Sequence, residues 1–222
     1  MIGATGAVGR EMVNFALQNK EISEFTLIIR KKLPAWEEKE KSDETFKSKV
    51  KFIIKEDFDD LTTCAEELRG YNGFICCLGT RRKYGEDNFI KVDYQYPLNF
   101  ANLAKQLEIP FYGLLTSMGS KSSSMFLYMK TKGRVEEACT SVGIKSLVIY
   151  KPGLITDRDN DFRLGEKIGE FVPFIDKISA ANLANSMLLH SIHSIKNLPS
   201  EITKKELDNK LIKSFLKQSG KL

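Results

Sequence analysis

The sequence has no hydrophobic run long enough to cross a membrane. None of its apolar stretches approaches the roughly 18–20 consecutive residues that a membrane-spanning helix requires. No signal peptide is recognisable either, because Met1 leads directly into the glycine-rich residues that follow Ile2. We therefore expect a protein without a membrane span that is located in the cytoplasm.

Cysteine and histidine are also scarce, and neither is spaced as a set of metal ligands. Cys76 and Cys77 are adjacent within an apolar run, which predicts buried thiols in a reducing compartment. His190 and His193 would share a helix face, but no third ligand is near them in the sequence. Surface or partly buried histidines are therefore favoured over a metal pair, and we predict no metal site. The cysteines are Cys64, Cys76, Cys77 and Cys139.

A strong charge imbalance is absent as well. The 34 lysines and arginines exceed the 29 aspartates and glutamates by five, and they are scattered along the chain. The exceptions are two short basic clusters, at residues 30–32 and 81–83. Because a nucleic-acid-binding domain usually gathers its basic residues into a patch or stripe, we expect no direct binding to nucleic acid. The cluster at 81–83 either borders a phosphate site or, as we prefer, forms a solvated loop.

No repeat, low-complexity segment or linker divides the chain, so we predict a single domain over residues 1–222. From residue 25 onward, apolar strand-like segments alternate with helical ones. This alternation is typical of a parallel sheet with helices on both faces, and it predicts an α/β fold, a doubly wound sheet of the Rossmann type. Beyond residue 153 the pattern loosens, and we expect residues 154–222 to form a variable substrate-side region with C-terminal helices.

The apolar pattern also gives approximate element positions. The expected strands are 25–29, 50–54, 74–78, 111–115 and 146–150. The expected helices are 10–18, 61–68, 89–107, 126–142 and 180–193, with a partly helical loop at 34–49 and a charged tail at the end.

A glycine-rich turn, Gly3-Ala-Thr-Gly6-Ala-Val-Gly9, lies near the start of the sequence. In a dinucleotide-binding fold such a turn joins the first strand to the first helix, whose N-terminus presents unpaired N–H groups to an anion. Gly3 would allow the tight turn, Gly6 would let the backbone approach a pyrophosphate, and Gly9 would let the helix pack closely on the strand. Alone the motif is weak evidence and is also consistent with a plain tight turn. However, the expected strands that follow it in chain order end in residues that could line a dinucleotide site.

The first strand itself is almost absent, since only Met1 and Ile2 precede the turn. A doubly wound sheet places this strand in the middle, so the strands at 25–29 and 74–78 would lose the neighbour that they share. Each orphaned buried backbone group costs about 1–3 kcal/mol. Our hypothesis is that this start reflects a truncation, an alternative isoform or a misplaced initiator methionine.

Polar and small residues follow the expected strands, at the sheet edge where ligands of such folds bind. Arg30 and Lys31 stand where an NAD site usually has an acidic residue, and cations there favour the 2′-phosphate of NADP(H). A solvated charge cluster is the alternative interpretation. Asp57 would accept a hydrogen bond from the adenine amino group while Phe58 packs nearby. A polar residue and a core aromatic after a strand are equally consistent with that pair.

Tyr128 and Lys132 form a Y-x-x-x-K sequence and would lie one helical turn apart. A tyrosine hydroxyl with an ordinary pKa of about 10 is a poor acid–base catalyst at neutral pH. A cation one turn away favours the phenolate and brings such a pKa closer to the working pH. Ser117 lies eleven residues before Tyr128, at the end of the preceding strand. An exposed helical pair is the default interpretation of Y-x-x-x-K alone, but together with Ser117 and the glycine turn it predicts a catalytic set.

The glycine turn followed by Y-x-x-x-K resembles the short-chain dehydrogenase/reductase superfamily. The segments CCLGT-R and Y-x-x-x-K-G-x-V-E narrow the match, and the chain is similar to the Tat-interactive oxidoreductase-like family of atypical, NADPH-binding reductases. The similarity runs from Gly3 to about Arg163 and continues more weakly to the end. Further matching segments are GATGAVGRE, TLIIRKKL, F-I-K-V-D-Y, AKQLEI, LLTSMGS and KPGLI.

The resemblance implies a role for each matching position. Tyr128 would donate the proton to a carbonyl, Lys132 would bind the nicotinamide ribose and tune Tyr128, and Ser117 would orient the substrate oxygen. Arg30 and Lys31 would hold the 2′-phosphate. The other cofactor contacts would come from Thr5, Gly6, Ala7 and Val8 at the pyrophosphate, Leu78 and Gly79 along the adenosine and ribose, Ile155 near the nicotinamide, and Arg163.

The sequence departs from the family pattern at four positions, none of which removes a catalytic group. Lys31 stands in place of a second arginine and so loses one bidentate contact to a phosphate. The other departures are Ile29 for a small residue, Thr116 for a serine and Lys151 for an arginine.

Three interpretations of function follow. The first is an NADPH-dependent reductase of an unidentified small carbonyl compound. The second is a non-catalytic NADPH-binding regulator or scaffold with protein partners, because the resembled family is linked to nuclear import, transcription and growth control. Nuclear or organelle-surface pools would then exist beside the cytoplasmic one. The third is an inactive form whose sheet is incomplete. The intact set of Ser117, Tyr128 and Lys132 favours the first.

Overall fold

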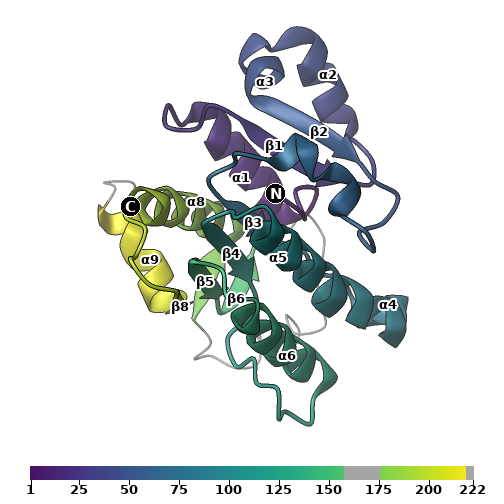
Figure 1. The fold of residues 1–222 in the computed structure, drawn as a ribbon, viewed down its shortest axis with the longest axis vertical. Coiled ribbons are helices and arrows are strands. Elements are labelled where there is room, and N and C mark those ends of the chain that lie inside the picture. Colours follow the sequence, from purple (N-terminus) through teal and green to yellow (C-terminus); the bar gives the residue numbers. More distant parts are fainter. Residues whose placement is uncertain (158–175, 219–222) are drawn as a thin grey trace.

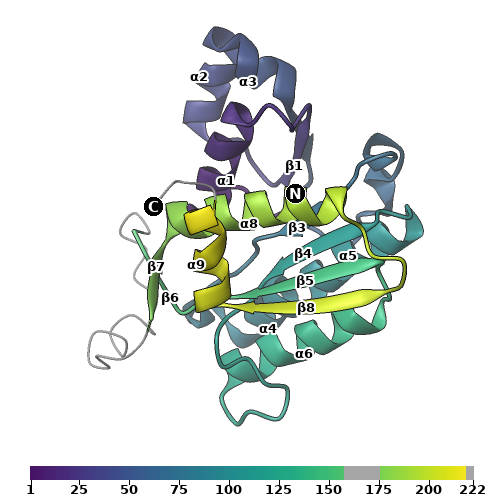
Figure 2. The same ribbon diagram turned by 90° about the vertical axis from the view of Figure 1, so that its left-hand side faces the viewer.

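A computed structural model describes residues 1–157 and 176–218 of the chain. Its centre is a parallel sheet with the strand order β2-β1-β3-β4-β5-β8, in which Met1 and Ile2 lie between β1 and β3 (Figures 1 and 2). This is the doubly wound arrangement that the sequence predicts. The strands are β1 (Phe25–Ile29), β2 (Val50–Ile54), β3 (Phe74–Cys76), β4 (Phe111–Leu115), β5 (Ser146–Lys151) and β8 (Thr203–Asp208).

Met1 and Ile2 hold the two halves of the sheet together. The Ile2 N–H donates to the Ile75 carbonyl at 3.1 Å, and the Cys77 N–H donates to the Ile2 carbonyl at 3.0 Å. On the other side, the Ile28 N–H donates to the Met1 carbonyl at 2.9 Å. At these two residues β1 and β3 therefore keep a common neighbour, and the expectation that they lose it is wrong there.

The amino group of Met1 is buried inside the sheet. It donates to the Thr26 carbonyl at 2.7 Å, and burial lowers its pKa to about 5. A cavity of about 220 Å³ lies beside it, and its lining includes Phe25, Tyr71 and Ile75. Burying this group as an uncharged amine avoids the large penalty of burying an unpaired charge.

Helices cover both faces of the sheet (Figure 2). Strand residues alternate between the two cores, so that Leu27 and Ile29 face one helical layer and Ile28 faces the other. The first layer consists of α1 (Ala7–Gln18), α8 (Ala180–Lys196) and α9 (Asn209–Gln218), with α2 (Pro34–Ser42) and α3 (Glu44–Lys49) beside α1. The second consists of α4 (Glu86–Ile90), the π-helical turn η4 (Lys91–Gln95), α5 (Tyr96–Gln106) and α6 (Leu127–Ser141).

Several elements differ from the sequence-based expectation. The expected helix at 61–68 is two short 3₁₀ turns, η1 (Thr62–Cys64) and η2 (Glu66–Leu68). The expected partly helical loop at 34–49 consists mostly of the two helices α2 and α3, and the expected helix at 89–107 contains the π turn. The charged tail is the edge strand β8, in which Leu207 is buried whereas Lys204 and Lys205 are exposed. An edge strand tolerates such charges, which also discourage pairing with another chain.

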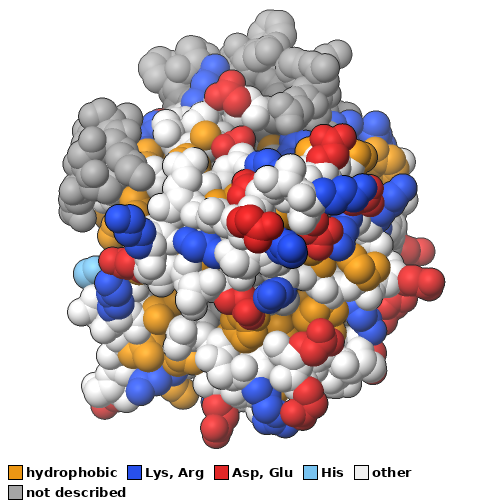
Figure 3. Space-filling view, turned by 90° about the horizontal axis from the view of Figure 1, so that it is seen from above, with side chains coloured by type: hydrophobic (Ala, Val, Ile, Leu, Met, Phe, Trp, Pro, Cys, Tyr) orange, Lys and Arg blue, Asp and Glu red, His pale blue; other side chains and the backbone are white. Residues whose placement is uncertain are grey.

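Beyond β5, the strands β6 (Leu154–Thr156) and β7 (Lys177–Ser179) form a small parallel ribbon. On the face shown in Figure 3, positive and negative side chains are interspersed over the residues that the structure describes. Within residues 1–157 and 176–218, no helix is long and apolar enough to cross a bilayer.

A buried hydrogen-bond network connects β5 to α8. The Tyr150 hydroxyl lies 2.9 Å from His190 Nδ1 and 3.2 Å from Ser191 Oγ. The His190 ring meets Phe215 of α9 edge-on, with 4.5 Å between centroids, and burial lowers its pKa to about 4. His193 is exposed as expected, but His190 is only 3% exposed. The described residues contain no cluster that could hold a metal ion.

We expect this buried imidazole to make the protein less stable as the pH falls from 6.5 to about 4. The unfolded chain takes up a proton at His190 near pH 6.5, whereas the folded protein resists protonation until about pH 4. The stabilisation is therefore complete above pH 6.5, and up to about 3 kcal/mol of it is lost below. In urea unfolding, the free energy of unfolding of His190→Gln should depend less steeply on pH in this range than that of the wild type. The control His193→Gln should keep the wild-type pH dependence. Equal slopes of unfolding free energy against pH in His190→Gln and the wild type would contradict the prediction.

Candidate functional site

The glycine turn forms a tight junction between the start of α1 and the end of β3. Gly3 has a φ of +80°, and a Cβ there would lie 2.5 Å from the Cys77 carbonyl carbon. A Cβ on Gly9 would lie 2.2 Å from the Gly3 oxygen, so the helix could not pack this closely with any other residue. Gly6 differs, because the nearest atom to an added Cβ is 3.5 Å away. The turn therefore leaves open space beside Gly6, where a ligand could approach.

The N-terminus of α1 suits an anion. Gly6 is its N-cap and supplies no side-chain hydrogen bond, and the first turn carries no acidic residue. The N–H groups of this turn are thus left to a ligand, with the helix dipole favouring negative charge. Thr5 and Gly6 are exposed and Ala7 is half-buried, whereas the Val8 side chain is in the core, so that Val8 would contribute through its backbone.

Three consecutive cations follow β1, and they have different environments. Lys32 is held by the fold, because its Nζ lies 2.6 Å from a Glu40 oxygen and 4.5 Å from the centroid of the Phe52 ring. Arg30 and Lys31 are exposed, and neither forms an ion pair with another residue in the described part of the chain. Arg30 and Lys31 therefore remain available for an anionic ligand at this sheet edge.

The ends of β2 and β3 complete the adenosine side of the candidate cofactor site. Asp57 is exposed, and its carboxylate accepts a hydrogen bond from the Asp59 N–H at 3.0 Å. The Phe58 ring is only 4% exposed and packs 5.3 Å from the Tyr96 ring, so its face is not open to an adenine. Leu78 and Gly79 are half-buried and lie just beyond β3, after Cys77 and next to the glycine turn.

The loop after β4 carries Ser117 and packs onto α6. Its backbone bonds are Met118 N–H to the Pro152 carbonyl at 2.9 Å and Lys121 N–H to the Met129 carbonyl at 3.1 Å. These bonds connect the ends of β4 and β5 to the helix of Tyr128. Ser117 is half-buried, and its hydroxyl donates to the Met118 carbonyl at 3.2 Å.

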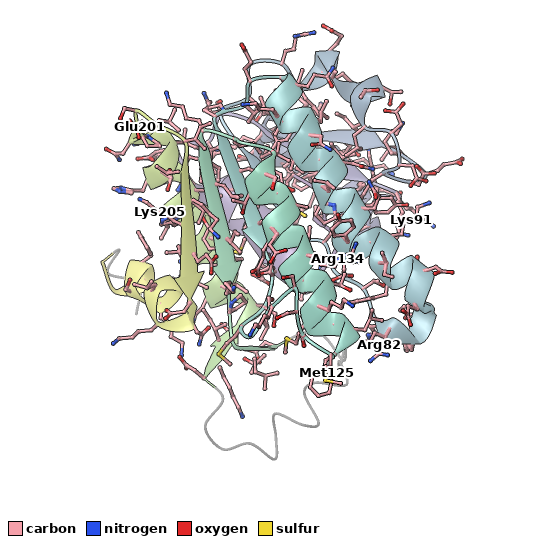
Figure 4. All side chains as sticks on the ribbon, turned by 60° about the horizontal axis from the view of Figure 1, so that its bottom comes forward. Arg82, Lys91, Met125, Arg134, Glu201 and Lys205 are labelled. Atoms are coloured by element: carbon pink, nitrogen blue, oxygen red, sulfur yellow. The ribbon has the colours of Figure 1, made fainter. Side chains whose placement is uncertain are left out.

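Tyr128 and Lys132 lie one turn apart on α6, on the side that faces α4 and η4. The Tyr128 ring is half-buried, with its centroid 6.0 Å from that of Phe89. Figure 4 shows α6 lying alongside the α4–α5 helix, and Arg134 of α6 places its guanidinium 4.9 Å from the centroid of the Tyr94 ring. The packing of α6 against α4 and η4 thus places the Tyr128 ring next to Phe89.

Lys132 is buried in an ion pair with Asp93, which sequence reasoning did not assign to the site. Its Nζ lies 2.8 Å from Asp93 Oδ1, and the two side chains are 4% and 0% exposed. The other carboxylate oxygen accepts the Thr80 N–H at 2.7 Å. Burial lowers the pKa of Lys132, but the charge of Asp93 and the nearby Tyr128 outweigh it, so the pKa of Lys132 is raised.

The sequence did contain a signal for Asp93. The residue lies in the middle of an otherwise apolar helical stripe that includes Phe89, Tyr96 and Phe100, all of which are buried. A carboxylate in such a stripe must find a buried partner, because an unpaired charge there is very costly. Asp93 also lies within a π turn, a feature frequent at functional sites.

Ile155 and Arg163 are the last two of the expected cofactor-binding residues. Ile155 lies in β6 opposite Ile178 of β7 and is 7% exposed, so most of its side chain is part of the core. Arg163 lies outside the residues that the structure describes.

A doubly wound parallel sheet with a glycine turn at the start of α1, and a tyrosine–lysine pair on α6, defines the class of this protein. It has the Rossmann-type fold of the atypical short-chain dehydrogenases/reductases. Solved structures agree with this fold. A DesIV double mutant, a dTDP-glucose 4,6-dehydratase from Streptomyces venezuelae with NAD bound, superposes with a TM-score of 0.69. The identity is 12%, and the match covers 99% of this chain and 80% of that chain.

Sequence comparison places the chain more narrowly. Rat protein HTATIP2 is 35% identical over 167 residues, which cover 75% of this chain and 66% of the rat protein. The Candida albicans protein FMP52, named as mitochondrial, is 32% identical over 184 residues, covering 78% of this chain and 73% of that protein. The chain belongs to the Tat-interactive oxidoreductase-like family, which includes these relatives. It spans about two thirds of the length of the rat protein, and no family model matches it.

Proposed function

We propose that the protein is an NADP(H)-dependent oxidoreductase that reduces a small carbonyl compound. The observation that carries this proposal is the Tyr128–Lys132 pair, held on α6 beside the Ser117 loop at the sheet edge that bears the glycine turn. A tyrosine with a buried, charged lysine one turn away is suited to proton transfer. A protein that only binds a nucleotide has no need for this set.

The residues at the sheet edge fit a dinucleotide. The open space at Gly6 and the uncapped start of α1 suit a pyrophosphate. The exposed cations Arg30 and Lys31 suit a 2′-phosphate, and no carboxylate stands in the place that would favour an NAD ribose. Asp57, the Phe58 backbone, Leu78 and Gly79 would line the adenosine.

The bound cofactor would supply the hydride, and the chain would supply the proton. Ser117 would donate a hydrogen bond to the carbonyl oxygen and fix its orientation. Tyr128 would give its hydroxyl proton to that oxygen, becoming a phenolate as the alcohol forms. The charge of Lys132 would stabilise this phenolate, and its remaining N–H groups would bind the nicotinamide ribose.

We expect Arg30 and Lys31 to select NADPH over NADH. Replacing both with alanine should weaken NADPH binding about 100-fold or more, since hydrogen bonds to charged groups contribute roughly 1.5–3 kcal/mol each. NADH affinity should stay within about twofold, because NADH lacks the 2′-phosphate. The control is Lys32→Ala, which removes a neighbouring cation that is already paired with Glu40. Fluorescence titration measures both affinities, and an unchanged NADPH/NADH ratio in the double variant would refute the assignment.

The first experiment is a titration of the 222-residue chain with NADPH and, separately, with NADH. Tight binding of NADPH alone supports the proposal and justifies a screen of small aldehydes and ketones. If NADPH binds but no carbonyl compound is reduced, the non-catalytic regulatory function becomes the better account. Failure of both nucleotides to bind would contradict the cofactor site itself.

We infer that residues 1–222 form one domain, because α8 and α9 pack into the same core as α1. Residues 154–222 would supply most of the substrate side. We propose a cytoplasmic location, with an organelle surface as the alternative suggested by the mitochondrial names of the fungal relatives.

A further inference from the structure

The ion pair between Asp93 and Lys132 joins three separate segments of the site. Asp93 lies in the π turn η4, Lys132 lies on α6, and the Thr80 N–H that also bonds the Asp93 carboxylate follows the Leu78–Gly79 end of β3. One carboxylate thus contacts the lysine of the catalytic pair and the loop beside the expected cofactor. Both charged side chains are almost completely buried.

Stability alone does not account for this arrangement. Removing two charges from water costs several kcal/mol per ion, and replacing a buried ion pair with apolar residues is often neutral or stabilising. The surrounding residues of the stripe, including Phe89 and Phe100, are apolar and would accommodate such a replacement. A functional requirement, and not stability, therefore explains why a charged lysine and its partner are buried here.

We propose that Asp93 is a positioning residue, which holds the Lys132 ammonium charged and aimed at the cofactor ribose and fixes the Gly79–Thr80 loop beside it. This inference rests on the proposed NADPH site. An ammonium group has three N–H donors. Asp93 Oδ1 is paired with Nζ at 2.8 Å and can accept at most one of them, which leaves at least two for a ribose hydroxyl and for Tyr128.

The groups that face Lys132 support this role. They are Asp93 from η4, Tyr128 from its own helix, and Cys76 and Cys77 from β3 and the residue that follows it. Burial raises the pKa of Cys76 to about 11 and raises that of Cys77 as well, so both thiols are neutral at physiological pH. Among the described residues near Lys132, the carboxylate of Asp93 is thus the counter-charge that opposes the effect of burial.

The test compares NADPH affinity from pH 6 to pH 10 in the wild type and in Asp93→Asn. Asparagine has nearly the same shape and keeps an oxygen for the Thr80 N–H, but it lacks the charge. The largest influence that opposes the burial of Lys132 is then removed, and the lysine should lose its proton at a lower pH. We expect affinity to stay flat in the wild type, whereas the variant binds at least tenfold more weakly at pH 9 and approaches the wild type toward pH 6. Asp93→Glu, which restores the charge, should restore the flat profile.

Two further variants separate positioning from a structural effect. Lys91 lies in the same π turn as Asp93, and its Nζ is 2.6 Å from Oδ2 of the exposed Asp59. Asp59→Asn removes the charge of this partner and should leave the pH profile of NADPH affinity unchanged. In a Lys132→Met background, Asp93→Asn should have no further effect on NADPH affinity, because Asp93 acts through Lys132. The inference would be overturned if Asp93→Asn lowered NADPH affinity equally in the wild-type and Lys132→Met backgrounds. It would also be overturned if the NADPH affinity of Asp93→Asn did not change with pH.

The wild type alone provides a second test in case Asp93→Asn does not fold. A tenfold fall in NADPH affinity centred below pH 9, absent in Lys132→Met, would mean that Lys132 loses its proton despite Asp93 and would overturn the inference. A flat profile up to pH 9 supports it. No NADPH binding by the wild type at any pH overturns the proposed function as well, and this outcome is distinct from a failure of the ion pair alone.

Discussion

Replacing Tyr128 with phenylalanine should abolish carbonyl reduction and leave NADPH affinity within about twofold. The variant removes only the hydroxyl, because a phenylalanine ring can keep the contact with Phe89 at 6.0 Å. A positioned general acid contributes about 10²–10⁴-fold to the rate, so turnover should fall by at least 100-fold. Oxidation of NADPH in the presence of a reducible aldehyde or ketone measures the rate, and fluorescence titration measures the affinity.

A matched control distinguishes loss of the acid from a general effect of the substitution. Tyr84→Phe removes the hydroxyl of another tyrosine, which is 60% exposed in the segment before α4, and should leave turnover unchanged. Retained turnover in Tyr128→Phe would rule out Tyr128 as the proton donor. Loss of NADPH binding together with turnover would instead mean that the ring hydroxyl belongs to the cofactor site.

Comparison of the wild type with this variant also separates the two functional interpretations. If the protein is a non-catalytic regulator, neither protein reduces a carbonyl compound, and Tyr128→Phe leaves both NADPH binding and partner binding intact. If it is an enzyme, the wild type turns over, whereas the variant binds cofactor but does not turn over. The position of Lys132 favours the enzyme, because a buried lysine paired with Asp93 is costly to maintain unless its charge is used.

Much of the fold could be predicted from local apolar patterns. The expected strands at 25–29, 50–54 and 111–115 coincide with β1, β2 and β4, because each contains buried residues bounded by polar ones. The edge strand β8 could not be predicted in this way. Of its six residues only Leu207 is buried, so it has almost no apolar pattern and is defined by its pairing with β5.

The candidate site, like the fold, could be predicted from the sequence only in part. The glycine turn, Ser117 and the Tyr128–Lys132 pair were recognisable because each has a characteristic local spacing. Asp93 has no such motif, since its partner Lys132 lies 39 positions further along the chain and the contact exists only when α6 packs against η4. Long-range contacts of this kind become visible only in the folded structure.

The second large effect is expected in the glycine turn, where two similar substitutions should both weaken NADPH binding but differ in their effect on stability. Gly9→Ala would place a Cβ 2.2 Å from the Gly3 oxygen and 2.7 Å from Ala4 Cα, both of which are backbone atoms. Because neither atom can move away without distorting the turn, we expect the free energy of unfolding to fall by about 1–3 kcal/mol or more. NADPH binding should be lost as well. Urea unfolding and NADPH titration measure the two effects.

Gly6→Ala is the matched substitution in the same turn. Gly6 has φ −76° and ψ 168°, which alanine adopts readily, and the nearest atom to the new Cβ is 3.5 Å away. The free protein should therefore be as stable as the wild type, but the methyl group would occupy the space proposed for the pyrophosphate and weaken NADPH binding at least tenfold. Unchanged binding in Gly6→Ala would contradict the proposed cofactor position, whereas a Gly9→Ala protein of wild-type stability would contradict the packing of α1 on the turn. The two glycines thus separate what the turn contributes to the fold from what it contributes to the ligand.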